Sequence, residues 1–398
     1  NINKLFVNMI QDKNGLNLAN LINTTKKATK QETTPENNTK PWIITLNNTK
    51  LNNNDFTFDD KINSILIQSK NFSSKADKLN INGSNISLDN INLSNPKLSY
   101  TDNKNALFIN TKNTNIKLKN FDLKDNLIAI KSVFLSDDNI DLKDNKSKLN
   151  IDINKTNLLV NSLNINGSKI KIDSSKLKTS TIVLNDLNSK LNIETTNTNL
   201  NANTIKINGS KIDISALNLD TLKIKLNDNL NKMNIDISDT AVDLKSFALN
   251  NSDILIKTIK LSKPDILFLD NTNNISLQTK DLEVFINSFS QKKNDLKMAS
   301  IRILEPNIIF LNTKDKTKIL ADNLDLSVTE FSNSQSGLKI SKAALNKPII
   351  SIILPKKDNT KEATKEIVKK ENKDESKSST KLDIGPLRII DATMNFED

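Results

Sequence analysis

The stretch "LNINGSKIKID" covers Leu163–Asp173, and a near copy, "IKINGSKIDIS", covers Ile205–Ser215. The copy starts at Ile205 instead of Leu163, forty-two positions further along the chain. This step of forty-two residues is the repeat interval. The same turn position is occupied in successive repeats by Gly83, Asp125, Gly167, Gly209 and Asn251. Gly, Asn and Asp tolerate the positive φ that a tight hairpin turn requires. The repeated phrase therefore predicts a β-hairpin turn in each repeat.

Three apolar columns follow the same repeat interval. The first column reads Leu93, Leu135, Leu177, Leu219, Leu261, Ile303 and Leu345. The second column reads Leu98, Ile140, Ile182, Ile224, Ile266, Ile308 and Ile350. The third column reads Tyr100, Leu142, Leu184, Leu226, Phe268, Phe310 and Ile352. Seven successive matches without an insertion or deletion define a repeat architecture.

Short stretches of the chain alternate apolar and polar residues, which is the pattern of a half-buried β-strand. "TLKIKL" (Thr221–Leu226) and "KMNIDI" (Lys232–Ile237) show this alternation. If each repeat were two coils of a β-helix, the half-step would also be apolar, but it holds Thr114, Thr156, Thr198 and Thr240. Turn signals within one repeat fall near Asn208, Thr221, Asp228 and Asp239. We therefore predict an all-β fold, a long antiparallel meander with four strands per repeat and few or no helices.

The predicted strands are apolar on one side only, and no helical pattern is available to cover that side. A soluble protein rarely exposes an apolar patch larger than about 600 Å². The face must therefore close on itself as a sandwich or barrel, or hold something apolar in an open groove. We favour the open groove, curled from a continuous sheet, because single sheets beyond about ten strands tend to curl or split. The residues predicted to line it are Leu135, Ile140, Leu142, Leu177, Ile182, Leu184, Leu219, Ile224, Leu226, Leu261, Ile266, Phe268, Ile303, Ile308 and Phe310.

The composition argues against catalysis. The chain of 398 residues contains no Cys and no His, so thiolate chemistry and the commonest general base are absent. Acid pairs such as Asp59–Asp60 and Asp137–Asp138 fall at turn signals, where Asp is favoured for backbone reasons. We therefore predict that the protein is not an enzyme and has no catalytic residue, metal or cofactor.

The formal net charge of +11 raises the question of a nucleic-acid partner. Proteins that bind single strands use aromatic platforms and Arg, whereas this chain has one Trp and one Tyr, and its arginines are Arg302 and Arg388. Its Lys residues are interleaved with Asp and Glu. We therefore predict no nucleic-acid partner, while a basic surface suits anionic lipid headgroups.

Short phrases near both ends of the chain carry a resemblance to a known family. One phrase consists of Gly15, Leu16, Asn17, Leu18 and Leu21. A second phrase is represented by Trp42, and again by Ile384–Gly385 with Phe396 and Asp398. These phrases resemble those of the AsmA-like family of bacterial envelope proteins, in particular the members with a repeated domain of unknown function. The resemblance implies a periplasmic protein of a Gram-negative bacterium, anchored in the inner membrane through a segment outside this sequence. It also implies that a hydrophobic β-groove holds phospholipid acyl chains, with an outer-membrane partner possible.

These patterns together predict the organisation of the chain. Residues 1–22 end a preceding β unit, residues 23–41 are a polar linker, and residues 42–355 form the repetitive groove. Residues 356–381 are a charged linker, and residues 382–398 begin a next β unit. The function expected is lipid binding that supports phospholipid transport between the two membranes and outer-membrane homeostasis. The alternative is a structural surface protein or adhesin that uses the β-array as a spacer.

Overall fold

The structure is a computed structural model, and it describes residues 1–13, 15–17, 43–125, 127–262, 264–304, 306–355 and 382–397. All regular secondary structure within these ranges is β-strand, and consecutive long strands pair antiparallel. The all-β meander predicted from the sequence is confirmed. The chain divides into two compact units, Asn1–Leu230 and Asn231–Asp398. Trp42 and the predicted linkers, residues 23–41 and 356–381, lie outside the described residues.

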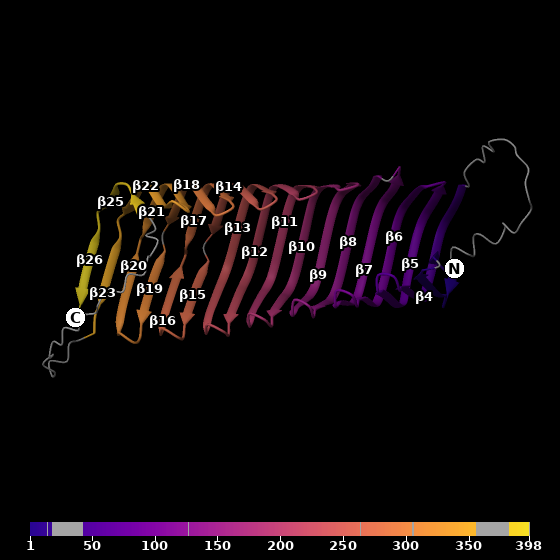
Figure 1. The fold of residues 1–398 in the computed structure, drawn as a ribbon, viewed down its shortest axis with the longest axis horizontal. Coiled ribbons are helices and arrows are strands. Elements are labelled where there is room, and N and C mark those ends of the chain that lie inside the picture. The colour runs from indigo at the N-terminus through magenta and orange to yellow at the C-terminus, as the bar shows by residue number, and fades with distance from the viewer. Residues whose placement is uncertain are drawn as a thin grey trace, which may run out of the picture. The chain divides into compact units, whose positions relative to one another are not determined.

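The N-terminal unit holds three short strands followed by a stack of long ones (Figure 1). The short strands are β1 (Ile2–Asn3), β2 (Phe6–Asp12) and β3 (Gly15–Leu16). The long strands, each of 18 residues, are β4 (Ile43–Asp60), β5 (Ile65–Asn82), β6 (Asn85–Asp102), β7 (Leu107–Lys124), β8 (Leu127–Asp144), β9 (Leu149–Asn166), β10 (Lys169–Asp186), β11 (Leu191–Asn208) and β12 (Lys211–Asp228).

The C-terminal unit begins with a long strand and continues with shorter ones. Its first half contains β13 (Met233–Asn250), β14 (Asp253–Ser262), β15 (Asp265–Asp270), β16 (Ile275–Lys280), β17 (Glu283–Lys292), β18 (Asp295–Leu304) and β19 (Asn307–Asn312). Its second half contains β20 (Thr317–Asp322), β21 (Asp325–Ser334), β22 (Gly337–Asn346), β23 (Ile349–Ile353), β24 (Leu382–Ile384), β25 (Leu387–Ile390) and β26 (Thr393–Glu397).

Each repeat consists of two strand lengths, a two-residue turn and a four-residue turn. In β4 to β13 each strand length is a single strand of 18 residues, so these repeats have two strands instead of the predicted four. In β14 to β23 each strand length is divided in two, which gives four strands per repeat, as between β14 and β17. Pro264, Pro306 and Pro348 mark some of these divisions, because proline cannot donate a backbone hydrogen bond to the ladder. The chain keeps its direction at each division and reverses only at the two kinds of turn.

The two-residue turns have the backbone conformation that the repeated phrase predicts. Gly167 and Gly209 have φ of 56° and 58°, and Asp125 and Asn251 have φ of 49° and 56° in the same position. Lys293 occupies this position in a later repeat with φ of 51°. No heavy atom lies within 4 Å of a Cβ built at Gly167 or Gly209, so the backbone conformation alone favours glycine there.

Each long strand bends twice, and the bends keep its apolar residues on one face. In β11, Leu191, Ile193 and Thr195 share a face, and the alternation then shifts by one residue at Asn197 (φ 51°). A second shift occurs at Thr204 (φ 48°), so that Ile205 and Ile207 return to the same face. The facing strand shifts at the same place, because the register runs unbroken from Ile172↔Ile205 to Ser174↔Asn203, so neighbouring strands bend together. The strand thus becomes three straight segments whose apolar side chains all point inward.

The inner side of the bend near Asn197 carries a buried row of small polar side chains across the N-terminal unit. Its members, each at most 7% exposed, are Asn95, Thr114, Asp137, Thr156, Thr179, Thr198 and Thr221. Thr114 donates a hydrogen bond to the carboxylate of Asp137, and the Thr198 and Thr221 hydroxyls lie 3.2 Å apart. The concave side of a bend leaves little room, which explains why small side chains stand here. The Thr residues found at half the repeat interval, such as Thr156 and Thr198, therefore belong to a structural row on the inner face.

Two junctions depart from the antiparallel order, because in each a strand pairs in parallel with a strand far along the chain. In the N-terminal unit β1 and β2 pair with β4, and in the C-terminal unit β22 and β23 pair with β24, β25 and β26. The Lys4 N–H donates to the Asn52 carbonyl (3.1 Å), and the Lys347 N–H donates to the Ile390 carbonyl (2.8 Å). Lys4 and Lys347 both have positive φ, 56° and 47°. The two junctions share one backbone geometry.

Candidate functional site: the apolar inner face

The residues predicted to line a groove form continuous rows on the inner face of each unit. In the N-terminal unit Ile140 of β8 and Ile182 of β10 both lie opposite Ile153 of β9. Ile182 and Ile224 of β12 both lie opposite Thr195 of β11. Members of one column are therefore two strands apart, about 9.6 Å at the usual strand spacing. The same strands carry the other predicted residues of this unit, which are Leu135 and Leu142 on β8, Leu177 and Leu184 on β10, and Leu219 and Leu226 on β12.

The C-terminal unit repeats this arrangement with aromatic residues added. Ile266 of β15 and Ile308 of β19 both lie opposite Thr279 of β16. Phe268 and Phe310 both lie opposite Leu277 of the same strand. The other two predicted residues of this unit are Leu261 on β14 and Ile303 on β18. The register therefore joins the predicted columns into rows within each unit.

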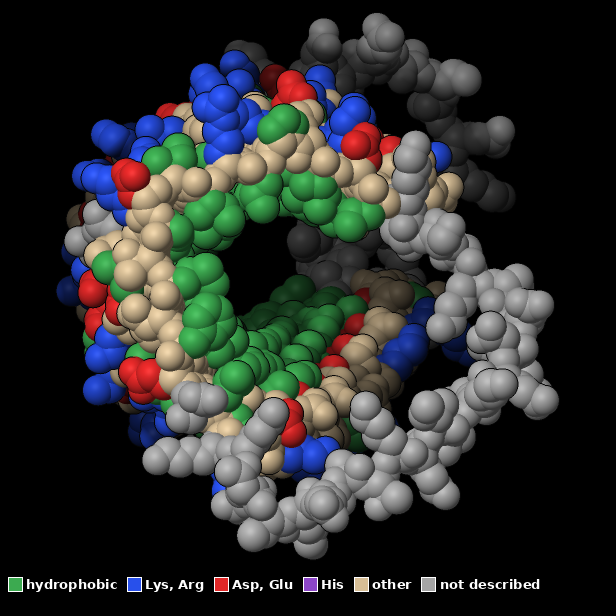
Figure 2. Space-filling view, turned by 90° about the vertical axis from the view of Figure 1, so that its left-hand side faces the viewer, with side chains coloured by type: hydrophobic (Ala, Val, Ile, Leu, Met, Phe, Trp, Pro, Cys, Tyr) green, Lys and Arg blue, Asp and Glu red, His purple; other side chains and the backbone are tan. Residues whose placement is uncertain are grey.

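Within the described residues, no second layer of protein covers the inner face. All fifteen predicted lining residues are half-buried rather than fully buried. Among the described residues, the buried aliphatic side chains are Ala202, Ile256, Ala321 and Ala343. In a closed sandwich, large apolar residues of two facing sheets interdigitate and exclude water. Figure 2 views the end of the C-terminal unit and shows apolar side chains around a hollow, with charged side chains on the outside.

Sequence reasoning missed half of the lining, namely the inward residues of the intervening strands. Ile151 of β9 lies opposite both Leu142 and Leu184, and Ile193 of β11 lies opposite both Leu184 and Leu226. In the C-terminal unit the missed residues include Phe247, Phe289 and Phe331. The sequence does carry a signal for these residues, because apolar residues lie at equal distances before and after each hairpin turn. Around Gly167, for example, Ile165 pairs with Ile170 and Leu163 pairs with Ile172.

The acidic side chains at the four-residue turns are structural groups. Asp60 Oδ1 accepts hydrogen bonds from the Ile62 and Asn63 N–H groups (2.9 and 3.0 Å), and Asn63 Nδ2 donates to Oδ2 (2.7 Å). These bonds, led by that from the Asn63 side chain, lower the pKa of Asp60 below its ordinary value. The same turn position lowers the pKa of Asp102, Asp144, Asp186 and Asp270. Such carboxylates cap turns and are poor candidates for general bases.

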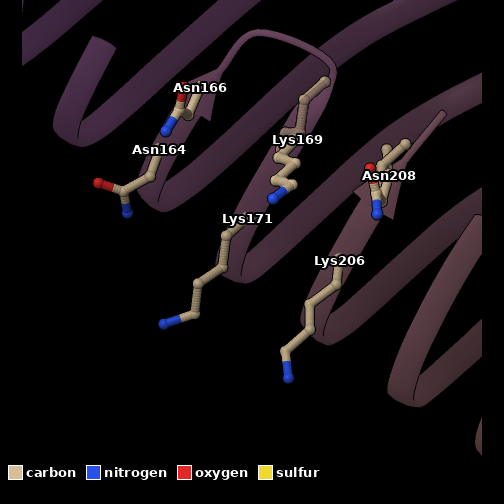
Figure 3. A pocket seen from close by; sticks show the side chains of 8 residues that line it. Asn164, Asn166, Lys169, Lys171, Lys206 and Asn208 are labelled. Atoms are coloured by element: carbon tan, nitrogen blue, oxygen red, sulfur yellow. The ribbon is translucent and has the colours of Figure 1, made fainter. Parts of the chain in front are cut away.

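A shallow depression on the outer face is the main polar alternative to the inner face as a site. Figure 3 shows Asn164, Lys169, Lys171 and Lys206 projecting from β9, β10 and β11 beside two hairpin turns. Lys171 lies directly opposite Lys206, and its Nζ is 3.2 Å from Asp173. All three lysines are exposed, so the depression is a solvated cationic surface without a buried polar group.

Neither a metal site nor a membrane-spanning helix is found where the structure is described. No group of acidic side chains in the described ranges could hold a metal ion. In those ranges no helix is long and apolar enough to cross a membrane. Comparisons with protein-family models, with curated proteins and with solved structures found no match.

Proposed function

We propose that this chain is a non-enzymatic lipid-binding protein whose apolar inner face holds the acyl chains of phospholipids. The observation that carries the proposal is the exposure of the lining residues. Rows of Ile, Leu and Phe run along the inner face of each unit, and they are only half-buried. Leaving this area in water is unfavourable by roughly 25 cal/mol per Å², so an apolar occupant would stabilise the protein.

The chemistry of the face suits flexible hydrocarbon better than a compact ligand. A small-molecule site usually places a few polar groups to fix the orientation of its ligand. Here the buried polar side chains of the inner face of the N-terminal unit form one row across β6 to β12, and the rows beside it are mainly Ile and Leu. An acyl chain needs no directional contact, so it can occupy any position along the rows.

The proposed setting is the bacterial periplasm, with an anchor in the inner membrane through a segment outside this sequence. Its support is the resemblance of Gly15–Leu16 and of Ile384–Gly385 with Phe396 to phrases of AsmA-like proteins. In that setting the face would carry phospholipid between the inner and outer membranes. The outer face, with lysines such as Lys169 and Lys206 exposed, would remain in water or beside anionic headgroups.

The rival function is a spacer in a surface protein, and site-specific photocrosslinking separates the two. A photoreactive amino acid replaces Leu184, on the inner face of β10, in cells that make the protein. The matched control replaces Val183, the next residue, which points to the outer face. We expect crosslinks to phospholipid from position 184 and not from position 183. Absence of lipid crosslinks at 184 in the folded protein would reject lipid binding and favour the spacer.

A further inference from the structure

Strand β4 and the broken strand β24–β26 are the same structural element at two places in the chain. Asn53 in β4 and Asp391 before β26 both have positive φ, 51° and 53°, at the second bend. The bend is followed by "FTF" at residues 56–58 and by "MNF" at residues 394–396. Phe58 lies in parallel register opposite Met9, and Phe396 lies opposite Ile352.

The parallel side of the two elements is matched hydrogen bond by hydrogen bond. The Asp55 N–H donates to the Leu5 carbonyl (2.9 Å), and the Thr393 N–H donates to the Pro348 carbonyl (2.8 Å). Likewise the Lys4 N–H donates to the Asn52 carbonyl (3.1 Å), and the Lys347 N–H donates to the Ile390 carbonyl (2.8 Å). The elements therefore enter their junctions in one register.

The other side of the two elements differs. β4 pairs on that side with β5, antiparallel, with Phe58 opposite Ile67 and Thr57 opposite Gln68. Within the described residues, β24, β25 and β26 pair only with β22 and β23. The backbone amides and carbonyls on this side of β24–β26 therefore face the position that β5 occupies beside β4.

The apolar side chains of β25 and β26 are exposed because no described strand covers this edge. Ile389, Met394 and Phe396 are 59%, 55% and 66% exposed. The corresponding residues of β4, Leu51, Phe56 and Phe58, are half-buried because strands flank them on both sides. A flat apolar edge of this kind is a template for another strand.

We propose that the free edge of β24–β26 binds an antiparallel strand of the β5 kind, the second strand of a further meander of this type. The register is that of β4 with β5, so a residue equivalent to Gln68 lies opposite Asn395, and one equivalent to Ile67 lies opposite Phe396. The added strand covers the exposed Met394 and Phe396 and extends the apolar rows by one strand. Backbone hydrogen bonds supply the pairing, and the alternation of side chains selects the register. The proposal is independent of whether the inner face holds lipid.

The absence of Cys from the chain makes disulfide trapping a direct test of this register. A second copy of residues 61–102 is appended directly after Asp398, which supplies the four-residue turn, β5 and β6. Asn395→Cys is combined with Gln68→Cys in the appended copy. The matched control combines Asn395→Cys with Ser69→Cys, because Ser69 points to the opposite face of the sheet. Both proteins are oxidised mildly and their disulfides are mapped by mass spectrometry.

We expect the 395–68 disulfide to form at least tenfold faster than the 395–69 disulfide. We also expect slower hydrogen exchange at the edge amides of residues 393–397 in the extended chain. If the extended chain does not fold, the test is repeated with a synthetic peptide of residues 61–82, carrying Gln68→Cys or Ser69→Cys, added to residues 1–398 with Asn395→Cys. Equal rates for the two pairs, or no disulfide from either pair in both formats, would overturn the proposal.

Discussion

Replacing Ile182 with Asp tests whether the inner face is an open apolar surface. Ile182 is half-buried between Ile153 and Thr195 on the neighbouring strands. Full burial of an Ile side chain stabilises a protein by about 1.5–3 kcal/mol, so a half-buried one contributes about 1 kcal/mol. The poor strand propensity of Asp removes about 1 kcal/mol more. We expect the free energy of unfolding to fall by about 2 kcal/mol in urea titration.

Thr181→Asp is the matched control, because Thr181 is the preceding residue of β10 and points to the outer face. It introduces the same charge and the same loss of strand propensity, so we expect a fall of about 1 kcal/mol. In parallel, both variants are purified from cells and their bound lipid is extracted and counted per chain. We expect Ile182→Asp to lose most of the lipid and Thr181→Asp to keep it.

Two results would refute this reasoning about the inner face. A loss of about 4 kcal/mol or more for Ile182→Asp, in the range of an unpaired charge forced into a dry core, would mean that the face is closed. Equal lipid content in the two variants would mean that lipid, if bound, does not occupy the row that contains Ile182.

Three further changes have expected outcomes. Gly385→Ala should release β24 and β25 from β22, seen as fast hydrogen exchange in residues 382–390, because its Cβ would lie 2.0 Å from the backbone oxygen of Ser341. Gly209→Ala should have only a local effect of about 1 kcal/mol, because its Cβ meets no atom and only its φ of 58° is unfavourable. Because the pKa of Asp102 is lowered in the fold, chiefly by the Asn105 side chain, this Asp adds stability above its unfolded pKa of about 3.9, and that stability is lost as the pH falls through the lower folded pKa. Thermal melting of Asp102→Asn should therefore depend less on pH below about 4, since an Asn can cap the turn without titrating, and an unchanged pH profile would contradict this role.

The hairpin repeat explains which parts of the fold the sequence predicts well. Translation by one repeat interval aligns strands that run in the same direction, so columns such as Leu177 with Leu219 are visible. The intervening strand runs the other way, and its residues are related by reflection about a turn. A translation by half the interval therefore lands on Thr198, which lies at a bend rather than on a row of Leu. Apolar residues of β9 and β11 were missed for this reason.

The sequence does not separate bends from turns, because both use the same backbone conformation. Asp239 has φ of 53° in the middle of β13, and Asn251 has φ of 56° in a hairpin turn. Thr221 also reads as a turn signal, yet it lies within β12. What distinguishes a turn is pairing across it, and pairing is a property of residues distant in sequence.

The described residues of each unit form no packed core, and this decides how stability is distributed in each unit. Every long strand contacts mainly its two neighbours, so the free energy of unfolding is approximately a sum of strand-pair terms. A substitution on the inner face then weakens two strand pairs and leaves distant pairs intact. An apolar occupant that runs along a row contacts many strands at once, so it would couple pairs that are otherwise independent. Lipid binding should therefore raise the cooperativity of unfolding as well as its midpoint. Extracting the lipid and repeating the urea titration measures this, and an unchanged slope would show that the occupant spans too few strands to couple them.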